Sequence, residues 1–504
     1  MKLASTLLLL VAGSFCLFHG CIASVIATPQ HVNDESKADD QLSEPIAPIS
    51  AINEEDKLEG LETLFERNLY VEPIKGADYQ YIKSAAVSVD EKPAEVEEDY
   101  VEPEPISEVE DELVQPEADV NGKPEGRANE CKVTIRGGLP TPQPIYLKSG
   151  SEEFYPYDTR GVMVVDSGKT LEMWCPGKFT TIDKTLLTAS CVSGTNFRVD
   201  GTTYSVKELT CKSWPGFVAE KTGASCNGGI MVRVGFKISS RRFVEQYQVC
   251  FNEDEEVTRY VHHDLNPGSN YYQTGVDRIT FQTGGFFDSK NVDKLYTQVT
   301  QQATINAHLG GDASKYFTSN KNIYLARGHM AAKADFDYGS EQRATFLFIN
   351  VAPQWQVFNA GNWARIEDGV RAKVSSAKWY VDCYTGVYGV TTLPNSDGVQ
   401  TPLYLSYDSN NNGQIPVPKL YFRVIIERSS QKGIVFIGVN NPHLTLNEIK
   451  KDYIICNDIS DRVNYVNWKR TDITAGYSYA CEVSDFRRKV THLPTLSAPG
   501  GLLL

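Results

Sequence analysis

The chain has 504 residues, a formal net charge of −15 and 41% hydrophobic residues. This length suffices for two or more domains with a sizeable core. An evenly spread acidic charge would argue against a nucleic-acid enzyme, but here the charge is unevenly distributed.

The first residues have the features of a secretory signal peptide, residues 1–23. Lys2 gives a positive start, an apolar stretch runs from Leu7 to Phe18, and small residues near Ala23 suit cleavage. A membrane anchor is the alternative, but this interrupted stretch is shorter than the ~20 residues that a helix needs to cross a bilayer. We therefore expect a soluble protein that is secreted and extracellular.

Acidic residues are concentrated in the next segment. Residues 24–127 contain 28 acidic and 8 basic side chains, whereas the remainder from Ala128 carries 36 acidic and 40 basic ones. The segment has too little apolar sequence to offset its chain entropy, which predicts a disordered acidic leader or propeptide. It is either a solvated tail or a propeptide that imitates a polyanionic substrate and covers a basic groove.

Cysteine usage agrees with secretion. Nine cysteines follow the signal segment, and six of them lie between residues 131 and 250, which predicts a disulfide-stabilised region from an oxidising compartment. Their spacings do not form the paired C-x-x-C units of a zinc site. Because nine is odd, one thiol is expected to be free or to pair between chains.

Residues 128–250 read as a small Cys-rich β module. The segments Val133–Arg136 and Gly161–Val165 are short and rich in β-branched residues, and turn clusters at 148–150 and 166–168 separate such segments. No catalytic constellation is evident in this module.

Residues 251–493 mix strands and helices without a regular alternation, which predicts an α+β domain, followed by a C-terminal tail at 494–504. The apolar patterns predict strands at Val276–Phe281, Phe346–Ile349 and Tyr421–Glu427, and helices at Asp293–His308 and Phe358–Val374.

The segment from Ala326 to Arg371 contains the residues with the greatest chemical potential. A histidine can deprotonate water, asparagine oxygens can hold a hard cation, and arginines can bind phosphate. These groups are His329, Asn350, Asn359, Glu367, Arg327 and Arg371. Helical spacing allows Glu367 and Arg371 to share one face with Asn359 two turns away. Taken alone, the same residues also fit a structural histidine and a surface ion pair.

The order and spacing of these motifs resemble the DNA/RNA non-specific endonucleases, the ββα-metal nucleases. The motifs are Ala326-Arg327-Gly328-His329, Asn350 to Gln354, and Asn359 to Arg371. The resemblance covers roughly residues 270 to 490. With its signal segment and Cys-rich module, the chain looks most like the secreted double-stranded ribonucleases of arthropods. The family fold implies a central antiparallel sheet with flanking helices and a catalytic β-hairpin followed by a helix.

The resemblance implies a role for each motif residue. His329 matches the general base, Asn359 the protein ligand of Mg²⁺, for which Mn²⁺ is a possible substitute, and Glu367 the residue that orients the hydrated metal. Arg327 and Arg371 match groups that stabilise the phosphate charge, and Asn350 supports the constellation.

These roles imply hydrolysis of phosphodiester bonds in double-stranded RNA and DNA, with single-stranded nucleic acid possible as a substrate and products that carry 5′ phosphate. The alternatives are a catalytically weak nucleic-acid-binding protein of the same fold, and a storage form that is inactive until the leader is removed. Ala326 departs from the family pattern, because many members have Asp at this position.

Other candidate sites are weaker. The run from Asp408 begins like a calcium loop, but its twelfth position is Lys419 and not Glu, so we expect a plain turn. We expect His262 and His263 to lie in a solvated stretch. Asp335 and Asp337 are expected at the surface, with a supporting role near His329 as the alternative.

Overall fold

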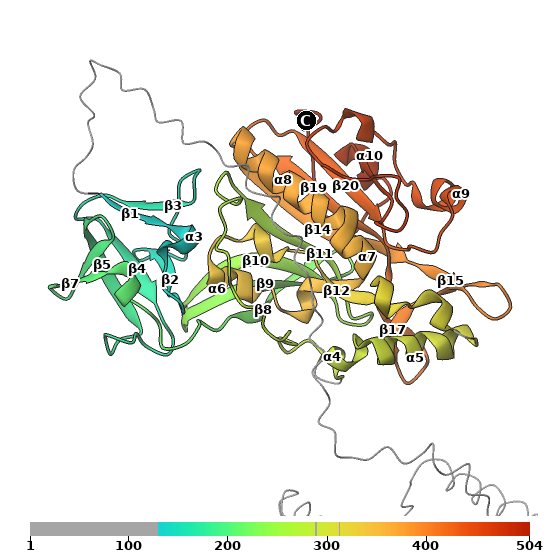
Figure 1. Cartoon of the computed structure of the whole chain (residues 1–504), viewed down its shortest axis with the longest axis horizontal. Helices are drawn as coiled ribbons and strands as arrows, with labels where there is room; N and C mark the ends of the chain where they lie inside the picture. The colour runs from blue at the N-terminus through green and yellow to red at the C-terminus, as the bar shows by residue number, and fades with distance from the viewer. Residues whose placement is uncertain (1–129, 288–289, 312) are drawn as a thin grey trace, which may run out of the picture. The chain divides into compact units, whose positions relative to one another are not determined.

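The computed structural model describes residues 130–504 except 288–289 and 312, and all of them belong to one unit, Asp99–Leu504 (Figure 1). The expected signal peptide and acidic leader lie outside the described residues. Within the described part, no helix has the length and apolar character that crossing a membrane requires.

The first described residues form the expected disulfide-rich β module. Its five-stranded sheet has the order β2-β4-β5-β6-β7, and β1 pairs with β3 beside it. The disulfides Cys131–Cys191 and Cys175–Cys211 cross-link this part. Its elements are β1 (Cys131–Thr134), α3 (Ile135–Gly138), β2 (Ile145–Lys148), β3 (Val162–Val165), β4 (Thr170–Trp174), β5 (Leu186–Ser193), β6 (Asn196–Val199), β7 (Thr202–Ser205) and η1 (Val206–Glu208).

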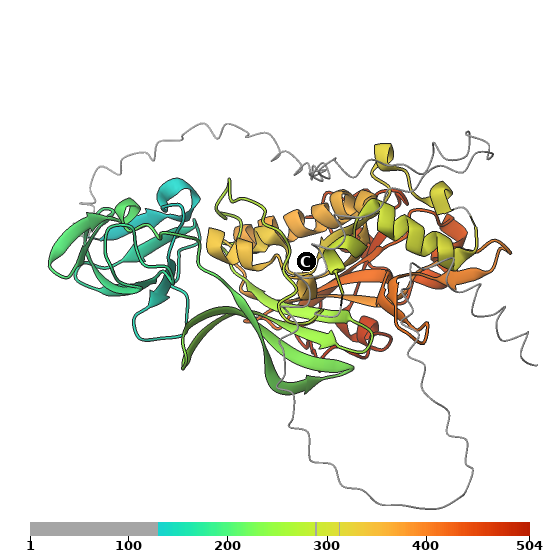
Figure 2. The same ribbon diagram turned by 90° about the horizontal axis from the view of Figure 1, so that it is seen from below.

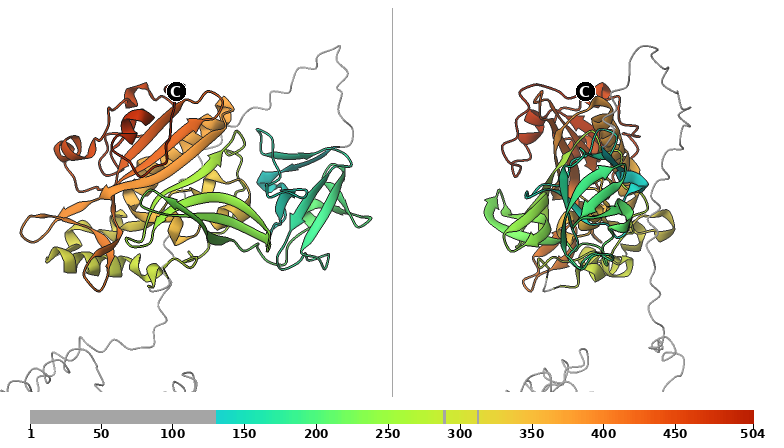
Figure 3. Two further views of the ribbon diagram at one scale, coloured as in Figure 1. Left: turned by 180° about the vertical axis from the view of Figure 1, so that it is seen from behind. Right: turned by 90° about the vertical axis from the view of Figure 1, so that its left-hand side faces the viewer.

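An eight-stranded sheet forms the centre of the second part, in the order β21-β20-β19-β14-β11-β10-β9-β8. All of its strand pairs are antiparallel, as the resemblance implies. The view from behind shows its long strands side by side (Figure 3). The strands are β8 (Val218–Cys226), β9 (Gly229–Ser239), β10 (Arg242–Asn252), β11 (Val257–Leu265), β14 (Val381–Val390), β19 (Pro418–Glu427), β20 (Gly433–Val439) and β21 (Ser478–Cys481).

The domain boundary expected at residue 250 lies inside this sheet. The strand β8 pairs with β9, β9 with β10, and β10 with β11, so β8, β9 and β10 belong to the second part and not to the module. The disulfide Cys226–Cys250 joins β8 to β10 within the same sheet. Consecutive strands have the same sequence pattern whether they form a small separate module or extend a large sheet. The sequence therefore did not reveal that the domain boundary lies before β8.

An antiparallel strand pair leads directly into a long helical segment on one side of this sheet. The pair consists of β12 (Leu325–His329) and β13 (Val351–Trp355), followed by α7 (Gln356–Phe358), η6 (Asn359–Trp363) and α8 (Ala364–Ala377). In α8, the side chains of Ile366, Val370 and Val374 are buried at helical spacing. The helix expected at 358–374 is confirmed and extended in both directions.

The two faces of the sheet bury separate cores. Val261, Cys383 and Ile425 point to the face that packs against the strand pair and α8. Tyr260 and Val424, one residue earlier in β11 and β19, point to the opposite face, which is covered by the C-terminal segment with α10 (Val483–Arg487). Figure 2 shows α8 and the preceding helices on one side of the sheet.

Three local expectations differ from the structure. Residues 276–281 are irregular, with Asp277, Arg278 and Thr280 exposed, and residues 348–350 form the short helix η5 (Phe348–Asn350). Residues 346–349 are apolar because they pack, and a short apolar run does not distinguish a strand from another buried segment. The residues 494–504 are not a free tail, because Leu503 is buried and its amide donates to the carbonyl of Gly433 at 3.1 Å.

The remaining elements are mostly short. The strand expected at 421–427 is confirmed as β19, and the helix expected at 293–308 is confirmed in two pieces, α4 and α5. The remaining elements are α4 (Val292–Leu295), α5 (Gln298–Leu309), η2 (Ala313–Tyr316), η3 (Ser319–Lys321), η4 (Lys333–Asp335), α6 (Gly339–Ala344), β15 (Thr392–Pro394), β16 (Gln400–Pro402), β17 (Tyr404–Tyr407), β18 (Gly413–Pro416), α9 (Leu446–Glu448), η7 (Ile449–Tyr453) and η8 (Ser460–Arg462). A fourth disulfide joins Cys456 to Cys481, and Cys383 is the free thiol that the odd count predicts.

Candidate active site

Along β12, the residues of the motif Ala326 to His329 alternate between the two faces of the strand. Ala326 and Gly328 are buried, whereas Arg327 and His329 are half-buried, so the two chemically active side chains share the outer face. A Cβ at Gly328 would lie 2.3 Å from Gln354 Oε1 and 2.8 Å from the hydroxyl of Tyr421. Glycine at 328 therefore lets β12 pack closely against Gln354 and Tyr421.

His329 lies between two aromatic rings. The ring centroids of Phe281 and Phe346 are each 5.3 Å from that of the imidazole, and His329 Nε2 has no hydrogen-bond partner in the described part of the chain. Burial, together with the positive charges of Arg278 and Lys333, lowers the pKa of His329 to about 3. The imidazole is therefore neutral near pH 7, with a nitrogen available to accept a proton.

Arg327 lies next to His329 through a shared aromatic neighbour. Its guanidinium carbon is 5.7 Å from the centroid of Phe281, the same ring that contacts His329, and its Nη2 donates to Asp293 Oδ1 at 2.9 Å. Asp293 is exposed, so this ion pair is screened by water. Arg327 can thus exchange this partner for a phosphate near His329.

Asn350 is buried behind the catalytic strand and holds the turn after His329. Its Nδ2 donates to the carbonyl oxygens of Ala331 and Thr345 at 3.0 and 2.9 Å. The Oδ1 atom of Asn350 accepts from the amide of Ala331 at 3.0 Å. Asn350 therefore supports the position of His329 without facing the solvent.

Asn359 lies where the helical segment after β13 is distorted. Gly361, with φ −95° and ψ −119°, lies outside the helical region, so the helical segment is kinked between Asn359 and Trp363. Gly361 permits the close approach here, since a Cβ would lie 2.6 Å from the carbonyl oxygen of Ala475. Asn359 Nδ2 donates to Gln356 Oε1 at 3.1 Å, which leaves the Oδ1 atom of Asn359 as its available acceptor.

Glu367 follows Asn359 by two turns of the same helical segment. It is half-buried, and within the residues that the structure describes its carboxylate forms no hydrogen bond or ion pair. Burial and the charge of Asp335 raise the pKa of Glu367 to about 8, although Arg423 and Arg371 partly offset their effect.

These acceptors fit a hydrated divalent cation. Asn359 Oδ1 and the Glu367 carboxylate are hard oxygen donors without a protein partner, which is the donor type that Mg²⁺ prefers. A cation would also give the half-buried Glu367 carboxylate a positively charged partner. The residues present are therefore compatible with a metal held by Asn359 and hydrated toward Glu367.

Arg371 does not face the solvent as a phosphate-binding residue would. Its side chain is 4% exposed, its Nη1 donates to Asp335 Oδ1 at 3.0 Å, and its Nη2 pairs with Asp368. The two pairings use two of the five N–H donors of the guanidinium, and burial limits the access of a ligand to the others. The role of Arg371 toward phosphate stays a prediction.

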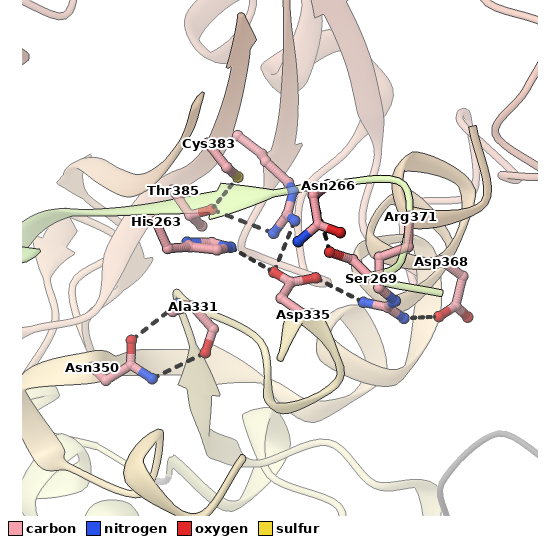
Figure 4. Close-up of polar contacts among 11 residues, drawn as sticks. His263, Asn266, Ser269, Ala331, Asp335, Asn350, Asp368, Arg371, Cys383 and Thr385 are labelled. Atoms are coloured by element: carbon pink, nitrogen blue, oxygen red, sulfur yellow. Dashed lines mark hydrogen bonds and ion pairs between the residues drawn. The ribbon is translucent and has the colours of Figure 1, made fainter. Parts of the chain in front are cut away.

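His263, Asp335 and Asp337 are fully buried, so the expectations of a solvated stretch and a surface position are wrong. His263 Nε2 lies 2.9 Å from Asp335 Oδ2, although the two residues are 72 positions apart in the sequence (Figure 4). The alternation of β11 could have indicated one inward-facing histidine, but not its partner.

A second cluster, of His262, Asp264 and Asp382, has ligand atoms within 4.8 Å of one another on the opposite face of the sheet. Arg428 donates to both carboxylates, and His262 Nε2 lies 3.2 Å from Asp382. The positive charge that these carboxylates need is thus supplied by Arg428, and the cluster reads as an ion-pair network.

The run from Asp408 is the plain turn that its sequence predicts. Asp408 Oδ1 accepts from the amides of Asn410 and Asn412 at 2.9 and 2.7 Å, and its Oδ2 accepts from Asn412 Nδ2 at 2.8 Å. The carboxylate is thus satisfied within the turn.

Comparison with known proteins places the motifs within a family match. The profile of the family described as DNA/RNA non-specific endonuclease matches residues 227–486, which begins inside the segment expected to belong to the module. The chain is 31% identical to the salivary endonuclease of Lutzomyia longipalpis over 355 residues, which are 69% of this chain and 80% of that protein. It is 23% identical to salivary protein Tsal2A of Glossina morsitans morsitans, covering 69% of this chain and 93% of that protein.

A solved structure of the EndoG/EndoGI complex matches 49% of this chain and 82% of its own chain, with 19% identity and a TM-score of 0.30. The assignment comes from the sequence matches, which span the sheet, the strand pair and α8 together. The chain belongs to the DNA/RNA non-specific endonuclease family and is a nuclease.

Proposed function

We propose that the protein is a secreted, sugar-non-specific endonuclease that hydrolyses phosphodiester bonds of double-stranded RNA and DNA with Mg²⁺, and that His329 is its general base. The observation that carries this proposal is the neutral, half-buried His329, whose Nε2 has no protein partner. A base must be unprotonated at the working pH, and burial of His329 meets this condition. Its Nε2 is itself buried, so water would reach it once the site rearranges around bound substrate.

In the proposed reaction, His329 accepts a proton from the water that attacks phosphorus. The bond to the 3′ oxygen breaks, and the product carries a 5′ phosphate. Arg327, on the same strand face, stabilises the charge of the phosphate as the reaction proceeds. Asn350 keeps the turn after His329 in place through its bonds to Ala331.

Asn359 and Glu367 are the residues that would hold and orient the metal. When bound, Mg²⁺ would neutralise negative charge and assist departure of the 3′ oxygen. The half-buried carboxylate and the amide oxygen, both without protein donors, support this assignment.

The absence of a carboxylate at Ala326 is compatible with activity. Ala326 is buried on the inner face of β12, together with Gly328, whereas Arg327 and His329 lie on the outer face. Substitution of Asp by Ala at this position therefore does not remove a group from the face that carries His329.

Secretion is supported by two observations. Four disulfides join eight of the nine cysteines after the signal segment, which requires an oxidising compartment. The relatives named above are described as salivary. Residues 1–23 would then direct export.

Incubation of the purified protein with duplex RNA and duplex DNA, with Mg²⁺, Mn²⁺ or a chelator, tests the proposal. We expect cleavage of both duplexes that stops with the chelator. His329→Ala should lower the rate by about 10²–10⁴-fold, the usual contribution of a general base. The matched control is His308→Ala, because His308 is also half-buried and stacked on a ring, that of Tyr407, but lies outside the site.

Two results would contradict the proposal. Cleavage by His329→Ala at the parental rate would remove the assigned base. Tight binding of duplex RNA without cleavage under every metal condition would instead support the alternative of a nucleic-acid-binding protein of the same fold.

A further inference from the structure

A single buried carboxylate joins three separate elements of the nuclease part. Asp335 Oδ2 accepts from Arg423 Nη2 at 2.8 Å and lies 2.9 Å from His263 Nε2, while its Oδ1 accepts from Arg371 Nη1 at 3.0 Å. Figure 4 shows Asp335 between His263 and Arg371. The side chains of Asp335, His263 and Arg423 are 0% exposed.

The partners come from distant parts of the sequence. His263 lies on β11, Arg423 on β19 and Arg371 on α8, whereas Asp335 ends η4, six residues after His329. The carboxylate therefore ties the loop that begins at the proposed base to both the sheet and the helix.

The charges fix this arrangement. Burial favours the neutral acid, but Arg423, His263 and Arg371 outweigh it and hold the pKa of Asp335 far below its usual value. Burial also disfavours a charged His263, but Cys383 and Asp335 outweigh it and raise the pKa of His263 to about 9. Buried charges are tolerated only when they are closely paired, so these contacts permit little displacement.

Arg371 transmits this constraint to the helix. Its Nη1 pairs with Asp335, and its Nη2 pairs with Asp368, one turn earlier on α8. The guanidinium therefore connects Asp335 to this turn of the helix. Glu367 lies beside Asp368 on the same turn of α8. A shift of Arg371 away from Asp335 would thus move the turn that carries Glu367 relative to the loop after His329.

We propose that Asp335 and Arg371 are a positioning pair for the nuclease reaction. They fix the helix that carries Asn359 and Glu367 to the loop that begins at His329, and Arg371 acts through this bond and not by touching the phosphate. This inference rests on the proposed function of His329, Asn359 and Glu367.

Affinity for Mn²⁺ without substrate distinguishes positioning from phosphate contact. Arg371→Met leaves the Asp335 carboxylate paired with both Arg423 and His263, so no buried carboxylate loses its last positive partner. We expect weaker Mn²⁺ binding by about 10-fold or more, the usual effect of losing a group that supports a metal ligand. If Arg371 only contacted phosphate, loss of its positive charge would leave Mn²⁺ affinity unchanged or increase it, and this result would overturn the proposal.

The matched control is Arg428→Met. Arg428 also bridges two aspartates, Asp264 and Asp382, beside a histidine, but on the opposite face of the sheet. We expect Mn²⁺ affinity and cleavage of this variant to remain within about 3-fold of the parent. Arg371→Lys keeps the charge and can reach one carboxylate, so it should restore part of the Mn²⁺ affinity, and a Lys variant no better than Met would contradict a role through that bond.

A double-mutant cycle on cleavage tests whether the two residues act together. Arg371→Met and Asp335→Asn should each lower kcat by about 10²-fold with KM little changed, because misplacement of catalytic groups has costs of that size. Their combination should be no slower than the worse single variant. Additive losses, or losses in kcat that match the unfolded fraction seen by circular dichroism, would overturn the pairing. If His329→Ala retained full activity, the proposed function would fail independently of these results.

Discussion

Gly328 lies against Gln354 with no room for a methyl group, because a Cβ at 328 would stand 2.3 Å from Gln354 Oε1 and 2.5 Å from Gln354 Cβ. The two residues are on neighbouring strands, and Ala326 is the direct partner of Gln354 in the pairing of β12 with β13. The glycine before His329 is thus a packing requirement of the strand pair.

Gly328→Ala should push β12 away from β13 and displace His329. We expect a loss of about 1–3 kcal/mol in the free energy of unfolding, as for other overpacked interiors, and a larger loss of cleavage than the folded fraction explains. Urea unfolding and initial rates on duplex DNA measure the two effects. Gly216→Ala is the control, since a Cβ there meets nothing within 4 Å. Parental activity in Gly328→Ala would show that the strand pair can relax without moving His329.

Asn350→Ala should destabilise the turn after His329. The change removes three hydrogen bonds and leaves the buried amide and carbonyl of Ala331 unpaired, whereas the Thr345 carbonyl still accepts from the Leu347 amide. We therefore expect a loss of about 2–4 kcal/mol in stability. Asn441→Ala is a matched control, because Asn441 is also buried and makes three bonds. Both variants should lose stability, but only Asn350→Ala should lose kcat at a temperature where each is folded. Equal kcat in the two variants would argue against a supporting role of Asn350.

Local patterns in the sequence predict the elements that carry the motifs. The helix from 358 and the unpaired cysteine are confirmed, because helical spacing and an odd count can be read directly from the sequence.

The buried charge network was not predictable in this way. His263 and Asp335 appear polar and solvated in sequence, and only the strand order brings them together across 72 residues. Likewise, Phe281 and Phe346 belong to segments expected to be strands, but they serve as the two rings around His329. Such contacts depend on tertiary packing, which a single sequence does not specify residue by residue.

The pH dependence of cleavage should lack the inflection of an ordinary histidine. Burial, with Arg278 and Lys333, lowers the pKa of His329 to about 3, so the imidazole stays neutral as pH falls through the usual histidine value of about 6.5. We expect kcat/KM at saturating Mg²⁺ to be flat between about pH 5.5 and 7. Lys333→Met removes one of the charges and should move the acid limb to higher pH. An inflection near pH 6.5 in the parent would contradict the burial of this imidazole.

Glu341→Gln should stabilise the protein at alkaline pH and not at acid pH. Glu341 is buried in α6, and burial raises its pKa to about 8, although the amide of Tyr338 partly offsets this by donating to the carboxylate at 3.1 Å. The folded state therefore binds the proton more tightly than the unfolded state, whose glutamate has a pKa near 4.5. The stability that this group contributes is present below about pH 4.5 and is lost as pH rises toward 8.

Glutamine keeps the acceptor for the Tyr338 amide but cannot ionise, so the variant should match the parent at pH 4 and exceed it by about 1–3 kcal/mol at pH 8.5 in urea unfolding. Glu448→Gln is the matched control, because Glu448 occupies the same capping position in α9 and accepts from the Thr445 amide at 2.7 Å. Hydrogen bonds from Thr445 lower the pKa of Glu448, so this control should lose a little stability at pH 8.5 and none at pH 4. A gain of stability that is the same at both pH values would mean that the Glu341→Gln substitution acts through packing and not through the buried charge.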